Sequence, residues 1–473
     1  MAMGRSKTLN QIELNNHSGL CNFPAIFNFG DSCKDAKGSK VKNTDKKQSF
    51  CSRDSVSACR GNDNASPSSI LVGSLPVPLD HSDVSNQSLP SDQTTPPASI
   101  QPLRKSTRIS TKPAYLQAYK CNQNSLFFNN SNSDTGGKSA AFDRLPSPNG
   151  DTFFGKPSGR FCDGQLVIDF IAEKLGLPYL SGYLDSIGTN FRYGANFATA
   201  GSTIQPVDAK IFEMGFSPFS LDIQLFQFEQ FKARTLELYR EGRSSYIESR
   251  FPRPEDFSKA LYTLDIGQND LHGGFVSMTE KQVLALIPNI INQSAEAVEK
   301  LYQLGARSFW IHNTGPIGCL PFAVIYYPPK PENMDQSGCV KSHNEVAKEF
   351  NRQLQERVTQ LGAQLPDAIL TYVDIFSAKY TLISEAKKLG FANPHGYCCG
   401  HLGDYNVDCG RKAMVNGTEV IGASCSNPSE YISWDGVHYS HAANKWIANQ
   451  ILNGNLSNPP IPITGACHKL GLS

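Results

Sequence analysis

The sequence lacks a charge excess and any long apolar run. Its 473 residues carry 44 Lys and Arg against 43 Asp and Glu, which gives a formal net charge of +1 at pH 7. Nucleic-acid binding needs a basic surface, so this balance disfavours a nucleic acid as partner. No stretch of eighteen apolar residues occurs, and we therefore expect no membrane span. The polar segment 1–20 also lacks the apolar core of a secretory signal peptide.

Cysteine spacing typical of a structural metal site is missing as well. None of the 13 cysteines forms a C-x-x-C pair, which disfavours the alternative of a zinc site. Several cysteines gather near the C-terminus, where the sequence contains Cys398, Cys399, Cys409 and Cys425. This clustering favours disulfides and an oxidising compartment. Glycosylation sequons agree weakly with secretion, and they occur at Asn292, Asn416 and Asn455.

Strand and helix patterns alternate along most of the chain. Residues 23–32 and 260–266 are apolar runs that end in glycine-containing turns, as buried strands do. Further strands are predicted at 307–312 and 369–374, and helices at 163–175, 281–304, 342–362, 376–389 and 441–452. The alternation predicts βαβ units and a parallel sheet with helices on both faces. Ligands of such sheets bind at the carboxyl ends of the strands, where both glycine turns are expected.

Residues 33–131 break this pattern. Lys, Ser, Asn, Asp and Pro dominate the segment, aromatic residues are few, and no apolar period persists. A segment of this composition cannot bury enough apolar surface to offset its ordering entropy, so we predict that it is disordered. Globular sequence resumes at Asn132.

Three residues have the chemistry of a serine esterase. Ser32 follows the strand 23–32, and a serine hydroxyl becomes a nucleophile once a base removes its proton. His438 is the candidate base, and Asp435 can orient it, because a spacing of three places both side chains on one side of a turn. An isolated Asp-x-x-His is usually a surface loop. Here it precedes the last predicted helix, in a chain that also carries a serine at a strand end.

Ester hydrolysis also needs hydrogen-bond donors for the oxyanion of the tetrahedral intermediate. Asn269 can offer its side-chain amide from the turn after strand 260–266, and Gly201 can offer a backbone N–H from a loop of small residues. Each residue alone would be read as an ordinary turn residue, but together they complete an acyl-transfer site. The G-x-S-x-G motif is absent, which disfavours the α/β-hydrolase fold.

A series of motifs, in order along the chain, resembles the plant GDSL esterases/lipases of the SGNH hydrolase superfamily, in their early-nodulin-like or fucosidase-like branch. The motifs are Phe23–Ser32, Asn132–Gly137, Gly194–Ser202, Gly267–Asp270, Gly315–Pro321 and Ser433–His438. The resemblance covers residues 21–32 and about 132–468, which we expect to form a single hydrolase domain after the polar tail 1–20.

The resemblance implies a three-layer α/β/α fold with a parallel, flavodoxin-like sheet. It makes Ser32 the nucleophile and first oxyanion donor, Gly201 and Asn269 the other donors, His438 the base and Asp435 its partner. It also implies no metal and no cofactor, an acyl-ester substrate on a small molecule or carbohydrate, and a monomer in the extracellular space or cell wall. Cys162 stands where relatives commonly have serine. Without it and the four cysteines of the insert, eight remain, enough for four disulfides of unassigned pairing.

The insert is the main departure from that family. Relatives run from Gly-Asp-Ser directly into Asn-Ser-Asp-Thr-Gly-Gly, whereas residues 33–131 intervene here. Residues 103–122 resemble the linker of copia-type retrotransposon polyproteins, which favours a transposon fragment or a wrongly joined gene product over a natural regulatory insertion. Ser131 also directly precedes Asn132, but it lacks the preceding Gly-Asp, so Ser32 is preferred. The alternative function is a catalytically inactive protein with a disrupted nucleophile turn.

Overall fold

The computed structural model describes residues 20–30, 144–185, 187–206, 216–242, 244–326 and 328–467. All of these residues belong to one compact unit. The predicted nucleophile Ser32 and the predicted insert 33–131 lie outside the described residues, so their predictions stay predictions. No helix among the described ranges is long and apolar enough to cross a membrane.

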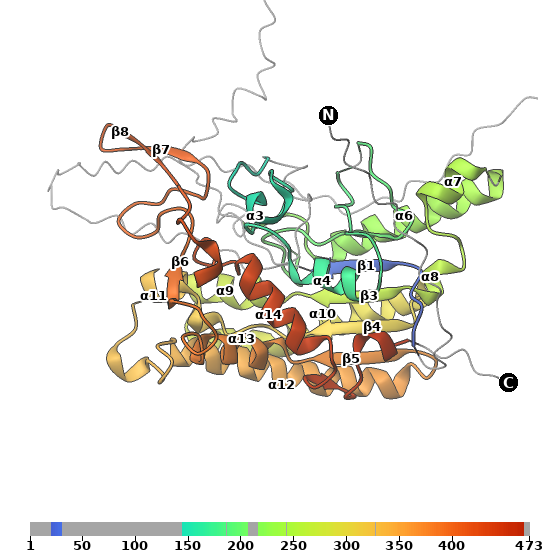
Figure 1. Cartoon of the computed structure of the whole chain (residues 1–473). Coiled ribbons are helices and arrows are strands. Elements are labelled where there is room, and N and C mark those ends of the chain that lie inside the picture. Colours follow the sequence, from blue (N-terminus) through green and yellow to red (C-terminus); the bar gives the residue numbers. More distant parts are fainter. Residues whose placement is uncertain are drawn as a thin grey trace, which may run out of the picture. The chain divides into compact units, whose positions relative to one another are not determined.

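A six-stranded sheet forms the centre of the described unit, with strand order β2-β1-β3-β4-β5-β10. Figure 1 shows its strands β1, β3, β4 and β5 side by side. The strands are β1 Ile26–Gly30, β2 Gly194–Asn196, β3 Leu261–Asp265, β4 Ser308–His312, β5 Ile369–Val373 and β10 Ser457–Asn458. The first five pair in parallel, in the 2-1-3-4-5 order of flavodoxin-like sheets. The predicted fold class is therefore confirmed. One detail differs from a purely parallel sheet, because the short edge strand β10 is antiparallel to β5.

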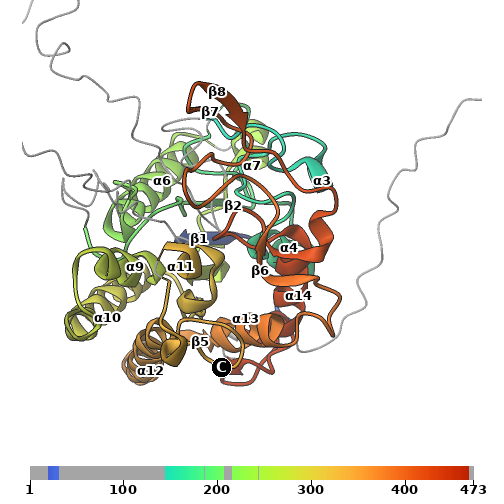
Figure 2. The same cartoon turned by 90° about the vertical axis from the view of Figure 1, so that its left-hand side faces the viewer.

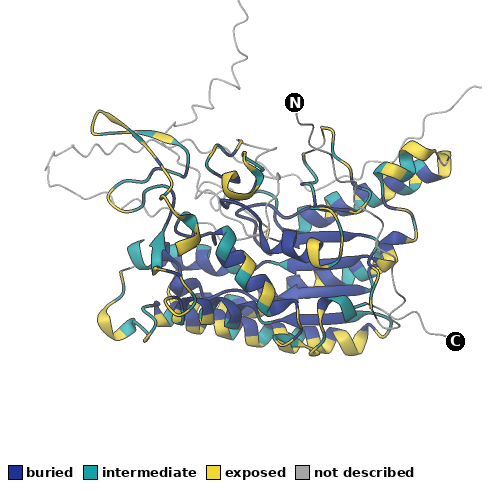
Figure 3. Cartoon of the chain, in the orientation of Figure 1, coloured by how far each residue is buried: buried dark blue, intermediate teal, exposed yellow. Residues whose placement is uncertain are grey.

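Helices cover both faces of this sheet. One layer contains α4 Val167–Lys174, α13 Ile375–Ser384 and α14 His441–Ile451, and the other contains α6 Leu221–Glu241, α10 Glu280–Gln303 and α12 Lys341–Gln364. Figure 2 shows the two layers on either side of the sheet. Alternate strand residues face opposite layers: Ile26 packs with the α4 layer, whereas Phe27 and Phe29 pack with the α6 layer. The five parallel strands are accordingly almost entirely buried (Figure 3), whereas the edge strand β10 is not.

Most predicted elements are present within a few residues of their expected bounds. The helix expected at 163–175 begins only at Val167, because the Asp163 carboxylate instead accepts the backbone N–H of His441 at the start of α14. Helix α6 was not predicted, although its apolar residues Leu221, Leu225 and Phe228 have helical spacing. This helical period could have predicted α6 from the sequence.

The remaining elements are short and lie mostly around the ends of the sheet. The helices are α3 Asp151–Phe154, α7 Ser245–Arg250, α8 Asp256–Lys259, α9 Gln268–Ser277 and α11 Pro321–Tyr326. Strands β6 Asn393–Tyr397 and β9 Tyr431–Ser433 pair in parallel, and β7 Lys412–Val415 and β8 Thr418–Ile421 form an antiparallel hairpin. Single 3₁₀ turns occupy Ile317–Cys319, Pro331–Asn333, Pro428–Glu430 and Ile463–Gly465.

Disulfides use the eight cysteines that the sequence singled out. The bridges are Cys21–Cys467, Cys319–Cys339, Cys398–Cys425 and Cys399–Cys409. Cys162 is a buried free thiol, and burial raises its pKa well above the usual value. Among the cysteines that the structure describes, the expectation of four bridges and an unpaired Cys162 is confirmed, and the structure supplies the pairing.

Candidate active site

The strand that leads to Ser32 ends at the switch point of the sheet, where the chain order reverses between β1 and β3. Its last residue, Gly30, lies opposite Asp265 of β3. Gly30 has φ +147°, and a Cβ added to it would lie 2.1 Å from the carbonyl oxygen of Asp265. Glycine is therefore required by both the backbone conformation and the close approach of β3. Ser32 follows two residues later, outside the described part.

The predicted oxyanion residues Gly201 and Asn269 lie near this strand end. The loop that carries Gly201 is joined to Gly30 by the backbone N–H of Thr199, which donates to the Gly30 carbonyl at 3.3 Å. Asn269 is fully buried, and its Nδ2 donates to the carbonyl oxygen of Ser202 at 2.8 Å. Asn269 lies within α9 rather than in an open turn, because the helix begins at once after strand β3 and Gly267.

Asp270 is a further residue of this region to which the sequence analysis gave no role. Its two carboxylate oxygens accept the backbone N–H groups of Ile204, at 2.8 Å, and Gln205, at 3.0 Å. Burial raises the pKa of Asp270 to about 7. The neighbouring side chains of Asn269 and Asp270 thus hold consecutive parts of the Gly201 loop. The position of Asp270 directly after Asn269 in the Gly267–Asp270 motif could have indicated this shared role from the sequence.

The predicted acid–base residues meet in a tight turn between β9 and α14. The side chain of Asp435 is hydrogen-bonded through Oδ2 to Nδ1 of His438, and its Oδ1 accepts the backbone N–H of His438 at 2.9 Å. The same turn is closed by the Trp434 N–H, which donates to the His438 carbonyl at 2.7 Å. His438 is only 1% exposed. The spacing of three therefore places both side chains together, as predicted.

Two buried aromatic residues, Phe161 and Trp434, support this turn. The ring of Phe161 stacks on the His438 imidazole, with ring centroids 5.1 Å apart and an interplanar angle of 18°. Trp434 donates from Nε1 to Oδ1 of Asn149 at 2.9 Å. Its ring packs in a small cluster with Cys398, Cys399 and Cys409. Phe161 is a functional candidate that sequence reasoning missed, since nothing in its spacing relates it to a histidine 277 residues away.

A carboxylate–imidazole pair joins the ends of strands β3 and β4, next to the end of β1. The Nδ1 of His312, at the end of β4, is 3.3 Å from Oδ2 of Asp265. Burial by itself would raise the pKa of Asp265, but the adjacent His312 imidazole and the more distant Lys379 hold it below the usual value. A negative charge at Asp265 is therefore stabilised beside Gly30, its partner across the sheet.

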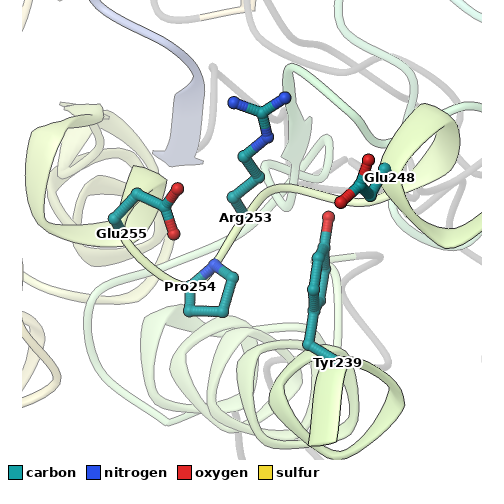
Figure 4. Close-up of a pocket in the computed structure, with 5 residues that line it drawn as sticks. All are labelled: Tyr239, Glu248, Arg253, Pro254 and Glu255. Atoms are coloured by element: carbon teal, nitrogen blue, oxygen red, sulfur yellow. The ribbon is translucent and has the colours of Figure 1, made fainter. Parts of the chain in front are cut away.

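A cavity of about 240 Å³ lies away from these residues (Figure 4). It is lined by Tyr239, Glu248, Arg253, Pro254 and Glu255. Arg253 and Glu255 precede β3 in the chain, and nearby Asp256 pairs with Arg192, just before β2. The cavity therefore lies at the amino ends of the strands, opposite the Asp435–His438 turn. Within the described ranges, no group of three or more His, Cys, Asp or Glu residues is arranged to hold a metal ion.

A flavodoxin-like α/β/α sheet with an aspartate–histidine pair in the turn before its last helix is the arrangement of an SGNH-type hydrolase. Comparison with known proteins agrees. The profile of the GDSL-like lipase/acylhydrolase family matches residues 127–451, so that the strand block 23–32 lies outside the matched range.

The chain is also similar to plant sequences over most of their length. It is 56% identical to GDSL esterase/lipase At5g14450 of Arabidopsis thaliana over 344 residues, 72% of this chain and 88% of the relative. It is 52% identical to GDSL esterase/lipase ACHE of Zea mays, over 73% of this chain and 88% of the relative. Alpha-L-fucosidase 3 of Arabidopsis thaliana is 48% identical over 73% of this chain and 94% of its own. The chain therefore belongs to the GDSL-like lipase/acylhydrolase family, whose members are ester hydrolases.

Proposed function

We propose that this chain hydrolyses carboxylic esters with Ser32 as nucleophile, His438 as base and Asp435 as the partner of that base. The observation that carries the proposal is the hydrogen bond between Asp435 and the buried His438, made through Nδ1 of the imidazole. A histidine bonded in this way directs Nε2 to the reaction, and the carboxylate stabilises the imidazolium that forms. Strand β1 brings the chain to the same end of the sheet two residues before Ser32.

The proposed reaction has two steps, the acylation of Ser32 and the hydrolysis of the acyl-enzyme. The Ser32 Oγ bonds to the ester carbonyl carbon while its proton passes to Nε2 of His438. The alcohol then leaves with that proton, and the acyl group stays on Ser32. In the second step water gives a proton to His438 and its oxygen bonds to the acyl carbon. The carboxylic acid leaves when Ser32 recovers the proton.

Backbone and amide donors stabilise the oxyanion of both tetrahedral intermediates. The proposed donors are the N–H groups of Ser32 and Gly201 and the side-chain amide of Asn269. The hydrogen bond from Asn269 to the Ser202 carbonyl supports this assignment, because it fixes the amide beside the Gly201 loop. The Asp270 carboxylate fixes the next part of the same loop.

The substrate class follows from the catalytic pair. One relative is named an α-L-fucosidase, which would be a glycoside hydrolase. Glycoside hydrolysis ordinarily uses two carboxyl groups that flank the bond to be cleaved. Here the carboxylate of Asp435 is committed to a histidine, which is the arrangement for acyl transfer. We expect the purified protein to cleave nitrophenyl acyl esters and to leave nitrophenyl α-L-fucoside intact.

Labelling with a fluorophosphonate serine probe tests the proposal directly. The full-length chain is treated with probe and the modified residue is mapped by mass spectrometry, with Ser32→Ala and Ser131→Ala as matched controls. We expect label on Ser32, its loss in Ser32→Ala and in His438→Ala, and its retention in Ser131→Ala. A folded parent that takes no label and cleaves no ester would support the inactive alternative. Label on Ser131 would transfer the nucleophile to that residue.

A further inference from the structure

We infer that Gln224 is a positioning residue that holds the end of β1 for the nucleophile turn. This inference rests on the proposed function, since it gives Gln224 a purpose only if Ser32 reacts. Gln224 is fully buried and lies in the first turn of α6, far from β1 in the sequence. Its side-chain amide bonds to both backbone groups of Gly30. Its Oε1 accepts the Gly30 N–H at 2.9 Å, and its Nε2 donates to the Gly30 carbonyl at 2.9 Å.

The amide of Gln224 continues the hydrogen-bond ladder on the β2 side of β1. Along that side, Ile26 donates its N–H to Tyr193 and the Asn28 carbonyl accepts the N–H of Phe197. Strand β2 ends at Asn196, however, while β1 continues to Gly30. A glutamine amide presents a carbonyl and an N–H in the same way as a peptide group. Gln224 therefore takes the place of a neighbouring strand at the Gly30 N–H, and at the Gly30 carbonyl it adds a second hydrogen bond to the one from the Thr199 N–H.

The same helix also sets the position of the oxyanion loop. The backbone N–H of Leu221, three residues before Gln224, donates to the carbonyl oxygen of Thr203 at 2.9 Å. The first turn of α6 is thus bonded to β1 through Gln224 and to the Gly201 loop through Leu221. Nucleophile and oxyanion donors must be held to within about half an ångström of productive geometry. One helical turn connects the two in this structure.

Substitution of Gln224 separates positioning from a purely structural role. In the full-length protein, Gln224→Ala removes both bonds to Gly30, and Gln230→Ala on the exposed side of α6 is the matched control. Ester turnover is normalised to the number of sites that the fluorophosphonate probe labels at saturation, so that misfolded molecules do not count. We expect kcat per labelled site to fall roughly 100-fold, the order seen for small displacements of reacting groups. KM should stay near the parental value, and Gln230→Ala should behave as the parent.

The variant Gln224→Glu gives a second, independent readout. A carboxylate can accept the Gly30 N–H but cannot donate to its carbonyl, whereas a protonated carboxyl can do both. The ratio of variant to parental kcat should therefore rise as the pH falls, although both enzymes lose activity as His438 is protonated. A role limited to stability would change the melting temperature and leave this ratio flat.

The outcomes keep the two proposals apart. If Gln224→Ala retains the parental kcat per labelled site, the positioning role is wrong, whatever its melting temperature. If Gln224→Ala does not fold, a pH-independent ratio for Gln224→Glu overturns the inference. If the parent itself is not labelled at Ser32, the proposed function fails first, and the positioning role fails with it.

Discussion

The two halves of the proposed catalytic site are built in different ways. The end of β1 at Gly30 is held by partners far away in the sequence, Asp265 in β3 and Gln224 in α6. Within the Asp435–His438 turn, most hydrogen bonds join residues at most five positions apart, and a longer-range bond runs from the Phe322 N–H to the Gly436 carbonyl. One half therefore depends on the assembled sheet, whereas the other is a local motif. The difference explains why spacing alone could predict the second half and not the first.

The two halves also differ in covalent support. Cys398 and Cys399 donate their backbone N–H groups to the Trp434 carbonyl, and both residues form disulfides, with Cys425 and Cys409. The carbonyl of Trp434, where the turn begins, is therefore held by two residues that are themselves fixed by disulfides. The end of β1 has no bridge nearby in the described structure, since Cys21–Cys467 lies before the strand begins. The residues of β2, β3 and α6 that pair with β1 or bond to Gly30 all follow residue 190 in the sequence. They therefore lie outside the predicted insert 33–131.

The largest expected effect comes from breaking the local half. Asp435→Asn removes the carboxylate that fixes and stabilises the His438 imidazole, so we expect kcat to fall by about 10⁴-fold with the fold intact. Nitrophenyl acyl ester turnover, with circular dichroism as a control for folding, measures this. A decrease of less than tenfold would contradict the role of Asp435.

Gly30→Ala breaks the long-range half. The added methyl would lie 2.1 Å from the Asp265 carbonyl, and the residue would keep φ +147°, so β1 or β3 must move. We expect a loss of about 3 kcal/mol or more in the free energy of unfolding, from the combined strain and overpacking. Gly176→Ala is the matched control, because Gly176 also has positive φ, +70°, but has no atom within 4 Å of an added Cβ. Equal urea midpoints for the two variants would show that the close approach of β3 does not matter.

Removing one cross-link sharpens the comparison between the halves. The double variant Cys399→Ser/Cys409→Ser opens a bridge between residues 10 apart. We expect a loss of about 2 to 3 kcal/mol in stability and a lower kcat per labelled site, since the support of Trp434 is weakened. The control Cys21→Ser/Cys467→Ser should lower stability while leaving kcat per labelled site near the parental value. If only the Cys21→Ser/Cys467→Ser variant lost kcat per labelled site, the bridges next to Trp434 would contribute to stability alone.

The effect that is smallest near neutral pH concerns α9, which carries Asn269. Burial lowers the pKa of His272 in this helix to about 3, from a usual value of 6.5. The unfolded chain therefore binds a proton at this residue between pH 6.5 and 3, whereas the folded protein does not, and stability falls as the pH decreases through that range. The slope is at most about 1.4 kcal/mol per pH unit. Chemical denaturation at several pH values should show a shallower acid decline for His272→Gln, and an unchanged slope would contradict this.

The sequence alone determined the elements whose signals are local. Apolar runs and helical periods predicted the strands at 260–266, 307–312 and 369–374, and the spacing of Asp435 and His438 predicted their contact. The family resemblance set Cys162 and the insert cysteines aside, which left eight cysteines for four bridges of unassigned pairing. The strands and the Asp435–His438 contact depend on residues within a turn or an element, where spacing fixes geometry.

Only the tertiary structure decided which distant residues meet. It paired the cysteines, turned β10 antiparallel, stacked Phe161 on His438 and brought Gln224 to Gly30. No period or spacing encodes such contacts, because they depend on how separate helices and strands pack together. The parallel sheet supplies the physical reason: it brings the end of β1, the start of α9 and the loop after β2 to one edge only once all its strands have paired.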